Sequence, residues 1–142
     1  MTTAERVVID AGPLVALLKS DDAAHTECEA LVRSLRTPFY TTWPVVTEVA
    51  WLLRKRPDGP QSVLALVESG LVVCLDLGPD APEWMRAFLD RYADLRPQLA
   101  DASLVYAAEK LGTETIFTLD RRDFHVFRSA SGRSFRLLPE TA

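Results

Sequence analysis

The stretch VVIDAGPLVALL, residues 7–18, decides the fold, because it joins a short buried strand directly to a helix. Val7–Ile9 is a β-branched run and predicts the strand. The strand stops at Asp10, and Gly12-Pro13 opens a helix that continues to about Leu18, since the missing N–H of proline costs nothing in a first helical turn. A strand that runs straight into a helix is typical of the parallel sheets of α/β proteins.

The same alternation of short apolar strands and helices continues to the end of the chain. We expect further strands over 39–41, 71–75, 115–118 and 134–138, and helices over about 23–35, 44–53, 60–69, 82–93 and 98–111. Gly70 and Gly112 are predicted to end two of these helices. The pattern predicts an α/β sandwich, in which helices cover both faces of a mainly parallel sheet of about five strands.

Length and composition limit the class of protein. The 142 residues are the size of one ordinary domain, so we expect a single domain over 1–142. No apolar run approaches the roughly 18 residues of a membrane span, and the start of the chain is not a secretory signal. Cys28 and Cys74 are far apart, which favours two thiols in a reducing cytoplasm. The net charge of −4 argues against holding nucleic acid by bulk electrostatics, but not against holding phosphates through a bound metal.

Two acidic residues directly follow predicted strands. Asp10 comes after the strand at 7–9, and Asp120 comes just after the strand that ends near Thr118. Ligands of open parallel sheets bind outside the carboxyl ends of the strands, so both carboxylates face one cleft if these strands are neighbours. The alternative is that each residue only caps the helix that follows it.

Two further acids, Glu48 and Asp101, occupy helical positions whose neighbours on the same face are apolar. The neighbours at helical spacing are Pro44, Val45, Trp51 and Leu52 for Glu48, and Leu104, Val105, Ala108 and Leu111 for Asp101. We therefore expect Glu48 on an apolar stripe rather than a solvated face, and Asp101 at the start of a core-facing stripe. An acid in such a place needs an ion pair or a bound cation. No Lys or Arg lies three or four positions away, although a distant arginine could still pair with either acid.

If the four acids converge, their mutual repulsion would keep some of them protonated near pH 7. A hard divalent cation removes that penalty, and ligation by carboxylate and water oxygens suits Mg²⁺ or Mn²⁺. Zinc is disfavoured, because His25 and His125 are isolated in the sequence and the two cysteines are far apart.

The segments that carry these acids resemble, in order and spacing, the four acidic motifs of PIN-domain ribonucleases. They are VIDAGPLVALL at 8–18, TWPVVTE at 42–48, LADASL at 99–104 and TLDRRDF at 118–124. The resemblance covers nearly the whole chain, and the short chain is similar to the VapC toxins of bacterial toxin–antitoxin pairs. It implies a PIN-like three-layer α/β/α sandwich and a Mg²⁺- or Mn²⁺-dependent endoribonuclease. It also implies a cytoplasmic protein, frequently a homodimer, whose site is blocked by a small cognate antitoxin.

The resemblance assigns Asp10, Glu48, Asp101 and Asp120 as the catalytic and metal-binding acids. Asp10 and Asp101 would hold most of the metal, and the other two would complete the cluster. Asp123 also fits the fourth motif; we place Asp120 first because it is nearer the strand end, and Asp123 would then orient the following turn or act from behind the ligands.

Several alternatives remain open at this point. Arg121 and Arg122 flank Asp120 and are predicted to contact RNA phosphates, or else they only solvate a surface loop. Leu14, Leu17 and Leu18 either bind an antitoxin helix or pack in the core. The alternative functions are a PIN nuclease of RNA maturation and a metal-binding interaction module without turnover. No serine or cysteine has a nearby histidine in sequence, so covalent catalysis has no support.

Overall fold

The computed structural model describes residues 5–140, and five strands in this range form one sheet with the order β3-β2-β1-β4-β5. The strands are β1 (Val8–Ile9), β2 (Phe39–Thr41), β3 (Val72–Cys74), β4 (Thr115–Phe117) and β5 (Arg136–Leu138). Every pairing between neighbouring strands of this sheet is parallel, and Val8 of β1 lies opposite Tyr40 of β2 and Ile116 of β4. The prediction of a parallel sheet of about five strands is confirmed.

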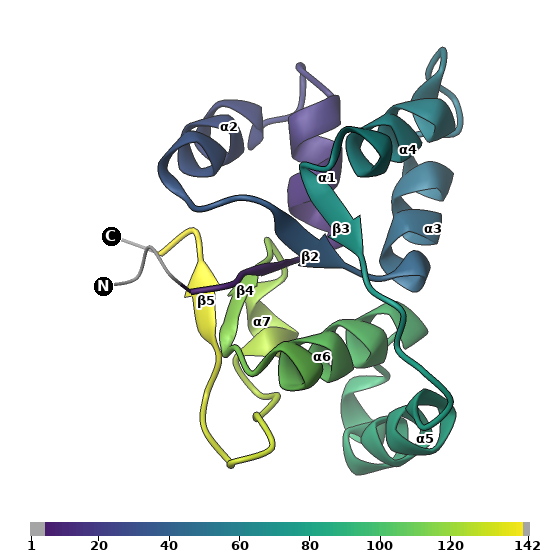
Figure 1. Ribbon diagram of the computed structural model, residues 1–142, viewed down its shortest axis with the longest axis vertical. Helices are drawn as coiled ribbons and strands as arrows, with labels where there is room; N and C mark the ends of the chain where they lie inside the picture. The colour runs from purple at the N-terminus through teal and green to yellow at the C-terminus, as the bar shows by residue number, and fades with distance from the viewer. Residues whose placement is uncertain (1–4, 141–142) are drawn as a thin grey trace.

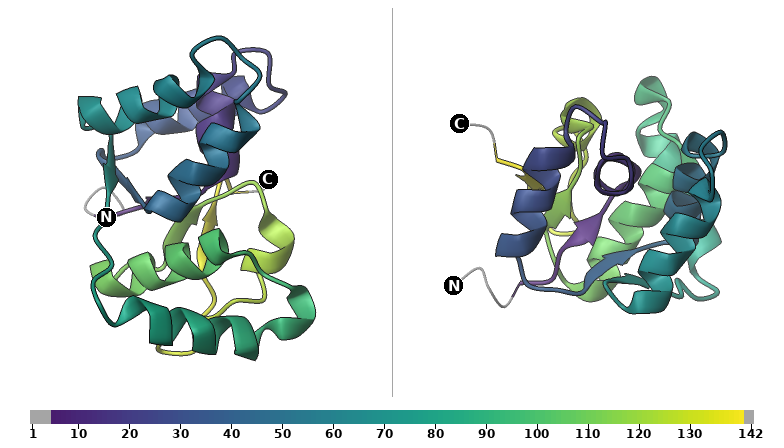
Figure 2. Two further views of the ribbon diagram at one scale, coloured as in Figure 1. Left: turned by 90° about the vertical axis from the view of Figure 1, so that its right-hand side faces the viewer. Right: turned by 90° about the horizontal axis from the view of Figure 1, so that it is seen from above.

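Helices cover both faces of the sheet (Figure 1). On one face lie α1 (Ala11–Leu18), α2 (His25–Ser34), α3 (Trp43–Leu52) and α4 (Gly59–Ser69). On the other lie α5 (Ala81–Arg91), the 3₁₀ turn η2 (Ala93–Leu95), α6 (Leu99–Leu111) and α7 (Arg121–Phe124). The left view of Figure 2 shows the same layers, so the architecture is the predicted α/β/α sandwich.

Three local features differ from the sequence prediction. The last strand begins at Arg136 and not at Ser134, because Ser134 forms an isolated antiparallel bridge with Arg128 that closes the loop between them. The short elements η2 and α7 were not predicted, since a single turn is too short to show an apolar periodicity. The helix predicted over 82–93 ends earlier, at Arg91, because the separate 3₁₀ turn η2 begins at Ala93.

The core lies between the sheet and the two helical layers. The central strands β1 and β4 contribute fully buried residues such as Ile9 and Phe117, as expected for parallel strands covered on both faces. Phe124 of α7 packs edge-to-face on Phe127, and Phe127 in turn contacts Phe88 of α5. These aromatic contacts anchor the short helix α7 against the core. None of the helices in residues 5–140 has the length and hydropathy needed to cross a bilayer.

Candidate active site

A cleft of about 460 Å³ lies where the carboxyl ends of β1 and β4 meet the amino-terminal turn of α6 and one side of α3. Its acidic lining residues are Asp10, Glu48, Asp101, Asp120 and Asp123. The structure therefore brings the four acids of the sequence prediction to one place, together with Asp123. Asp10 and Asp120 meet because β1 and β4 are hydrogen-bonded neighbours in the sheet, and α3 and α6 contribute Glu48 and Asp101.

Asp10 both caps a helix and faces the cleft. Its Oδ1 accepts a hydrogen bond from the Ala11 N–H at 2.8 Å, and its Oδ2 accepts one from the Thr118 hydroxyl at 2.8 Å. The Thr118 oxygen accepts the Asp120 N–H at 3.0 Å, so this threonine joins two of the acids. Burial raises the pKa of Asp10, the Ala11 and Thr118 bonds oppose that rise, and the charge of Asp120 adds to it. The sequence prediction missed Thr118, although its place two residues before Asp120 at the end of a strand was a visible signal.

Asp101 is held by the first turn of its own helix. Its Oδ2 accepts a hydrogen bond from the Gln98 N–H at 2.9 Å, in a capping box that fixes the carboxylate at the start of α6. The side chain is only 9% exposed, as expected for the start of a core-facing stripe. Burial raises the pKa of Asp101 to about 7, the Gln98 bond opposes the rise, and the charges of Asp10, Asp120 and Glu48 add to it.

Glu48 lies among apolar neighbours on α3, as predicted, and is half-buried rather than fully solvated. The side of α3 that faces the core carries Val45, Val46 and Val49, whereas the two apolar residues that follow Glu48 by one turn are exposed: Trp51 is 62% and Leu52 is 51% exposed. Apolar side chains occupy two sides of this helix, and periodicity alone does not say which of them faces the core. Glu48 is half-buried at the border between these two sides of α3. Its pKa is raised mainly by burial, and the charges of Asp10 and Asp120 add to the rise.

Asp120 and Asp123 both line the cleft, but their electrostatic effects differ. The charge of Asp120 raises the pKa of Asp10, Glu48 and Asp101, whereas Asp123 has no such effect on any of the three. The Asp120 carboxylate accepts no capping hydrogen bond from α7, and it lines the cleft. This difference favours Asp120 as the fourth member of the cluster.

Among the described residues, none of these acids has a neighbouring cation that neutralises it. Within residues 5–140, no Lys, Arg or His nitrogen lies within 4.0 Å of their carboxylate oxygens. The alternative in which a distant arginine forms a buried ion pair with Glu48 or Asp101 is therefore wrong for the part of the chain that the structure describes.

Two surface predictions change in the structure. The Arg121 guanidinium donates a hydrogen bond to the Pro139 carbonyl, which draws it toward the end of β5, while Arg122 is exposed. Leu14 is fully buried and belongs to the core, and Leu17 and Leu18 are partly buried against it. Core packing thus explains the first of these leucines completely.

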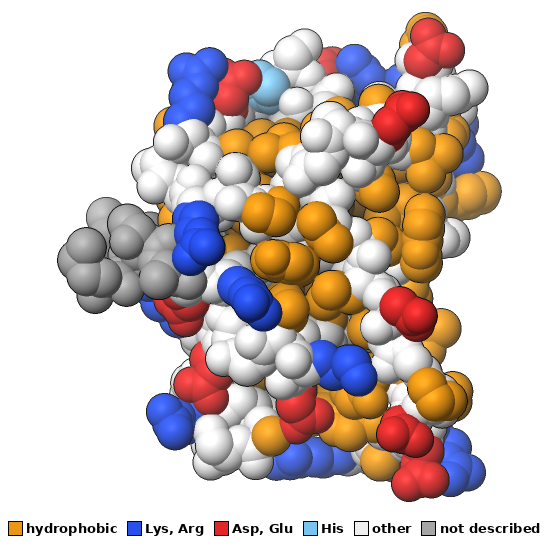
Figure 3. Space-filling view, in the orientation of Figure 1, with side chains coloured by type: hydrophobic (Ala, Val, Ile, Leu, Met, Phe, Trp, Pro, Cys, Tyr) orange, Lys and Arg blue, Asp and Glu red, His pale blue; other side chains and the backbone are white. Residues whose placement is uncertain are grey.

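An apolar groove of about 590 Å³ adjoins the acidic cleft and shares Glu48 and Gln98 with it. Its exposed apolar side chains are Trp43, Trp51 and Leu99, at the two ends of α3 and the start of α6. Figure 3 shows that hydrophobic side chains also gather over α3 and α4 on one side of the molecule. Patches of this kind mark contacts with other macromolecules more often than single exposed apolar residues do.

Comparison with known proteins identifies the family. The sequence profile of the PIN domain matches residues 7–129, which include all five acids of the cleft. The chain belongs to the PIN domain family. It is similar to Ribonuclease VapC26 of Mycobacterium tuberculosis (strain ATCC 25618 / H37Rv), with 28% identity over 135 residues that cover 94% of this chain and 100% of VapC26.

Two solved structures share the fold of this PIN domain. One is M. tuberculosis VapC20, described as a sarcin-ricin loop cleaving toxin, with a TM-score of 0.75, 21% identity, and coverage of 82% of this chain and 91% of VapC20. The other is VapBC2 from Rickettsia felis bound to a DNA fragment from its promoter, with a TM-score of 0.59, 14% identity, and coverage of 92% and 96%.

The cleft of this PIN domain has the donor chemistry for a hard cation. All of its acidic groups are carboxylates, and burial together with the charges of neighbouring acids raises the pKa of Asp10, Glu48 and Asp101, so a positive charge in the cleft would favour their ionised forms. In residues 5–140 no three Asp, Glu, His or Cys side chains already surround one point closely enough to hold an ion. An open cluster suits Mg²⁺, which keeps several waters and needs only one or two protein carboxylates.

Proposed function

We propose that this PIN domain is a Mg²⁺- or Mn²⁺-dependent endoribonuclease and the toxin of a VapBC-type toxin–antitoxin pair. The observation that carries the proposal is the meeting of Asp10, Glu48, Asp101 and Asp120 in one cleft without a cationic partner among the described residues. The similarity to Ribonuclease VapC26 supports cleavage of RNA as the reaction.

Asp10 and Asp101 are the residues that would hold the metal. A bound cation supplies an acidified water and polarises a phosphoryl oxygen. The Ala11 N–H and the Thr118 hydroxyl keep the Asp10 carboxylate in one orientation, and the Gln98 N–H does the same for Asp101. Each of these bonded oxygens has a second lone pair left for a ligand.

Glu48 and Asp120 complete the cluster from the other two sides of the cleft. Their charges repel those of Asp10 and Asp101, which strengthens the attraction of the site for a cation. No protein nucleophile takes part in the proposed reaction. In-line attack by water then leaves a 5′-phosphate and a 3′-hydroxyl.

The decisive experiment is incubation of the protein with a pool of cellular RNAs in Mg²⁺, in Mn²⁺ or in EDTA, followed by mapping of the cut ends. We expect discrete cuts with 5′-phosphate ends in either metal and none in EDTA. Cleavage that persists in EDTA would exclude the metal-dependent mechanism. Metal binding without any cleavage would favour the alternative of a non-catalytic metal-binding module.

A second experiment separates the toxin from a nuclease of RNA maturation. Expression without a partner is expected to arrest the growth of a bacterial host, and Glu48→Gln is expected to relieve the arrest. The VapBC complex of Rickettsia felis supports the presence of a small antitoxin partner. Unaffected growth with a soluble protein that cuts RNA in vitro would favour the maturation role.

The proposal also includes a homodimer in the cytoplasm. The exposed Trp43, Trp51 and Leu99 beside the cleft support a contact between two copies, because burying such side chains is favourable. Light scattering gives the mass in solution, and a monomer at all concentrations would remove the dimer from the proposal.

A further inference from the structure

Arg96 lies at the edge of the acidic cleft, in the turn between η2 and α6. Among the described residues that line the cleft it is the only Lys or Arg. Its backbone is in the left-handed region, with φ +50° and ψ 54°. Residues with a Cβ avoid that region, and a side chain held there despite its cost is a reason to look for a function.

The turn that carries Arg96 is fixed on both sides. The Arg96 N–H donates to the Ala93 carbonyl at 3.0 Å, and the Leu95 N–H donates to the Tyr92 carbonyl at 2.9 Å. Two residues after Arg96, the Gln98 N–H donates to the Asp101 carboxylate. The arginine is therefore attached to the same short segment that orients one of the cleft acids.

The Arg96 guanidinium makes no hydrogen bond or ion pair with any residue in 5–140. Other arginines near the site are engaged by carbonyl groups. Arg121 donates to the Pro139 carbonyl, and Arg54 donates to the Trp51 carbonyl at 2.8 Å and lies 3.6 Å over the Trp51 ring. Arg96 alone combines free donors with a place in the lining of the cleft.

Its separation from the acids is also informative. No Arg96 nitrogen comes within 4.0 Å of a carboxylate oxygen of residues 5–140, so the arginine lines the cleft without neutralising its acids. The acidic cluster and an unpaired guanidinium then face the same space of about 460 Å³. This arrangement suits a ligand that is itself an anion and is bound from one side through a metal and from the other through an arginine.

We propose that Arg96 binds a phosphate of the RNA backbone and positions the strand over the acidic cluster, an inference that rests on the proposed nuclease function. The planar fork of guanidinium donors fits two phosphate oxygens at once. Such a contact positions the strand without reading its bases. Because it exists before and during the chemical step, its loss raises KM more than it lowers kcat.

Steady-state cleavage of one identified RNA in Mg²⁺ tests the inference with Arg96→Gly, Arg96→Gln and Arg96→Lys. Arg96→Gly removes the side chain and also suits the left-handed backbone. We expect KM to rise about tenfold in the Gly and Gln variants, with kcat within about threefold of wild type. Arg96→Lys keeps the charge but loses the forked pair of donors, so we expect its KM to lie between that of wild type and that of the Gly and Gln variants. The melting temperature of Arg96→Gly should be unchanged or higher.

The matched control is Arg86→Gln, because Arg86 is an exposed arginine on α5 that does not line the cleft. It makes the same change in net charge and should leave KM unchanged. An unaltered KM in Arg96→Gly and Arg96→Gln, with a wild type that cleaves RNA, overturns the inference and leaves the proposed function standing. A fall in melting temperature in Arg96→Gly assigns the residue a structural role and overturns it too. A wild type that cuts no RNA overturns both.

Discussion

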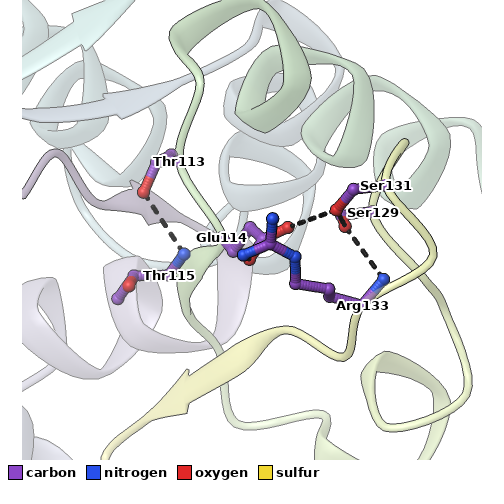
Figure 4. A network of polar contacts seen from close by, with 6 residues as sticks. All are labelled: Thr113, Glu114, Thr115, Ser129, Ser131 and Arg133. Atoms are coloured by element: carbon purple, nitrogen blue, oxygen red, sulfur yellow. Dashed lines mark hydrogen bonds and ion pairs between the residues drawn. The ribbon is translucent and has the colours of Figure 1, made fainter.

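Acidic side chains at the two ends of the sheet have opposite electrostatic environments, and their pKa values shift in opposite directions. At the carboxyl end, Asp101 has no cation within 4.0 Å in the described chain and its pKa rises to about 7. At the amino end, Glu114 precedes β4 and belongs to a polar network with Ser129, Ser131 and Arg133 (Figure 4). It accepts a hydrogen bond from the Ser131 hydroxyl at 3.1 Å and lies 3.9 Å from the Arg133 guanidinium. Hydrogen bonds from Ser129 and Ser131 and the charge of Arg133 lower its pKa.

The difference distinguishes an acid that supports the fold from acids that are available for chemistry. Glu114 is compensated by the loop that returns to β5, and it helps to hold that loop in place. The cleft acids are oriented by hydrogen bonds, but their negative charges still repel one another. A bound cation would relieve that repulsion. The charges and hydrogen-bond donors around an acidic residue, rather than the residue type alone, therefore indicate whether it supports the fold or is available for chemistry.

The largest expected effect is on cleavage. Asp10→Asn or Asp101→Asn should lower the rate of metal-dependent RNA cleavage by about 10³-fold or more, because each removes a charged oxygen proposed to hold the metal. The amide oxygen of asparagine can still accept the Ala11 or Gln98 N–H, so the fold should survive. Initial rates on one RNA measure the effect. Glu114→Gln is the matched control and should stay within about threefold of wild type; full activity in either Asn variant would reject the site.

The next effect is on stability in the presence of metal. Mg²⁺ at about 100 times its Kd should stabilise the wild type by about 2.7 kcal/mol, since it binds only the native state. For a domain of this size that raises the melting temperature by about 5–10 °C. The increase should shrink in Asp10→Asn and persist in Glu114→Gln. Thermal unfolding with and without millimolar Mg²⁺ measures this increase. A wild-type melting temperature that Mg²⁺ does not change would contradict a hard-cation site.

A smaller effect concerns pH in the absence of metal. The pKa of Asp101 is raised from 3.8 to about 7 in the folded state, so the native protein binds this proton more tightly than the unfolded chain does. Its influence is therefore destabilising as pH rises from about 4 to about 7. Asp101→Asn should make the decline of the melting temperature in EDTA shallower over that range. Identical slopes of melting temperature against pH in the variant and the wild type would mean that folding does not raise the pKa of Asp101.

For Glu114 the sign is reversed. Its lowered pKa contributes stability above the ordinary value of 4.5 that is lost as pH falls through the folded-state pKa, so Glu114→Gln should differ from wild type at neutral pH and converge with it in acid. The same set of melting curves contains this comparison.

The smallest expected effect is that of Arg121 and Arg122 together. Because Arg121 is drawn to the Pro139 carbonyl, the double change to Gln should weaken RNA binding by only about threefold, mostly through Arg122, and make its salt dependence shallower. The chemical step should change less than the affinity. RNA affinity measured over a range of salt concentrations tests this, and an unchanged affinity at low salt would leave these arginines no part in holding RNA.

The sequence by itself determined the frame of the site. The β-branched run before Asp10 and the apolar run before Asp120 predicted two buried strands that are followed by acids, because short β-branched and apolar runs are typical of strands covered on both faces. The spacing behind Asp101 predicted its place at the start of a buried stripe, since one side of α6 is continuously apolar. These signals are local, and they survive folding because the local periodicity and the tertiary packing agree.

Only the tertiary structure decided which side of α3 faces the core, and so where Glu48 lies, because its apolar residues on two sides give the periodicity no single answer. It also distinguishes Asp120 from Asp123, because the charge of Asp120 raises the pKa of the other three acids. Thr118 and Arg96 acquire their roles from groups far away in the sequence, the one by bonding Asp10 and the other by lining a cleft made from four segments. Spacing along a chain reports neighbours within a turn or two, whereas charge, burial and hydrogen bonding at a site depend on what the fold brings to it.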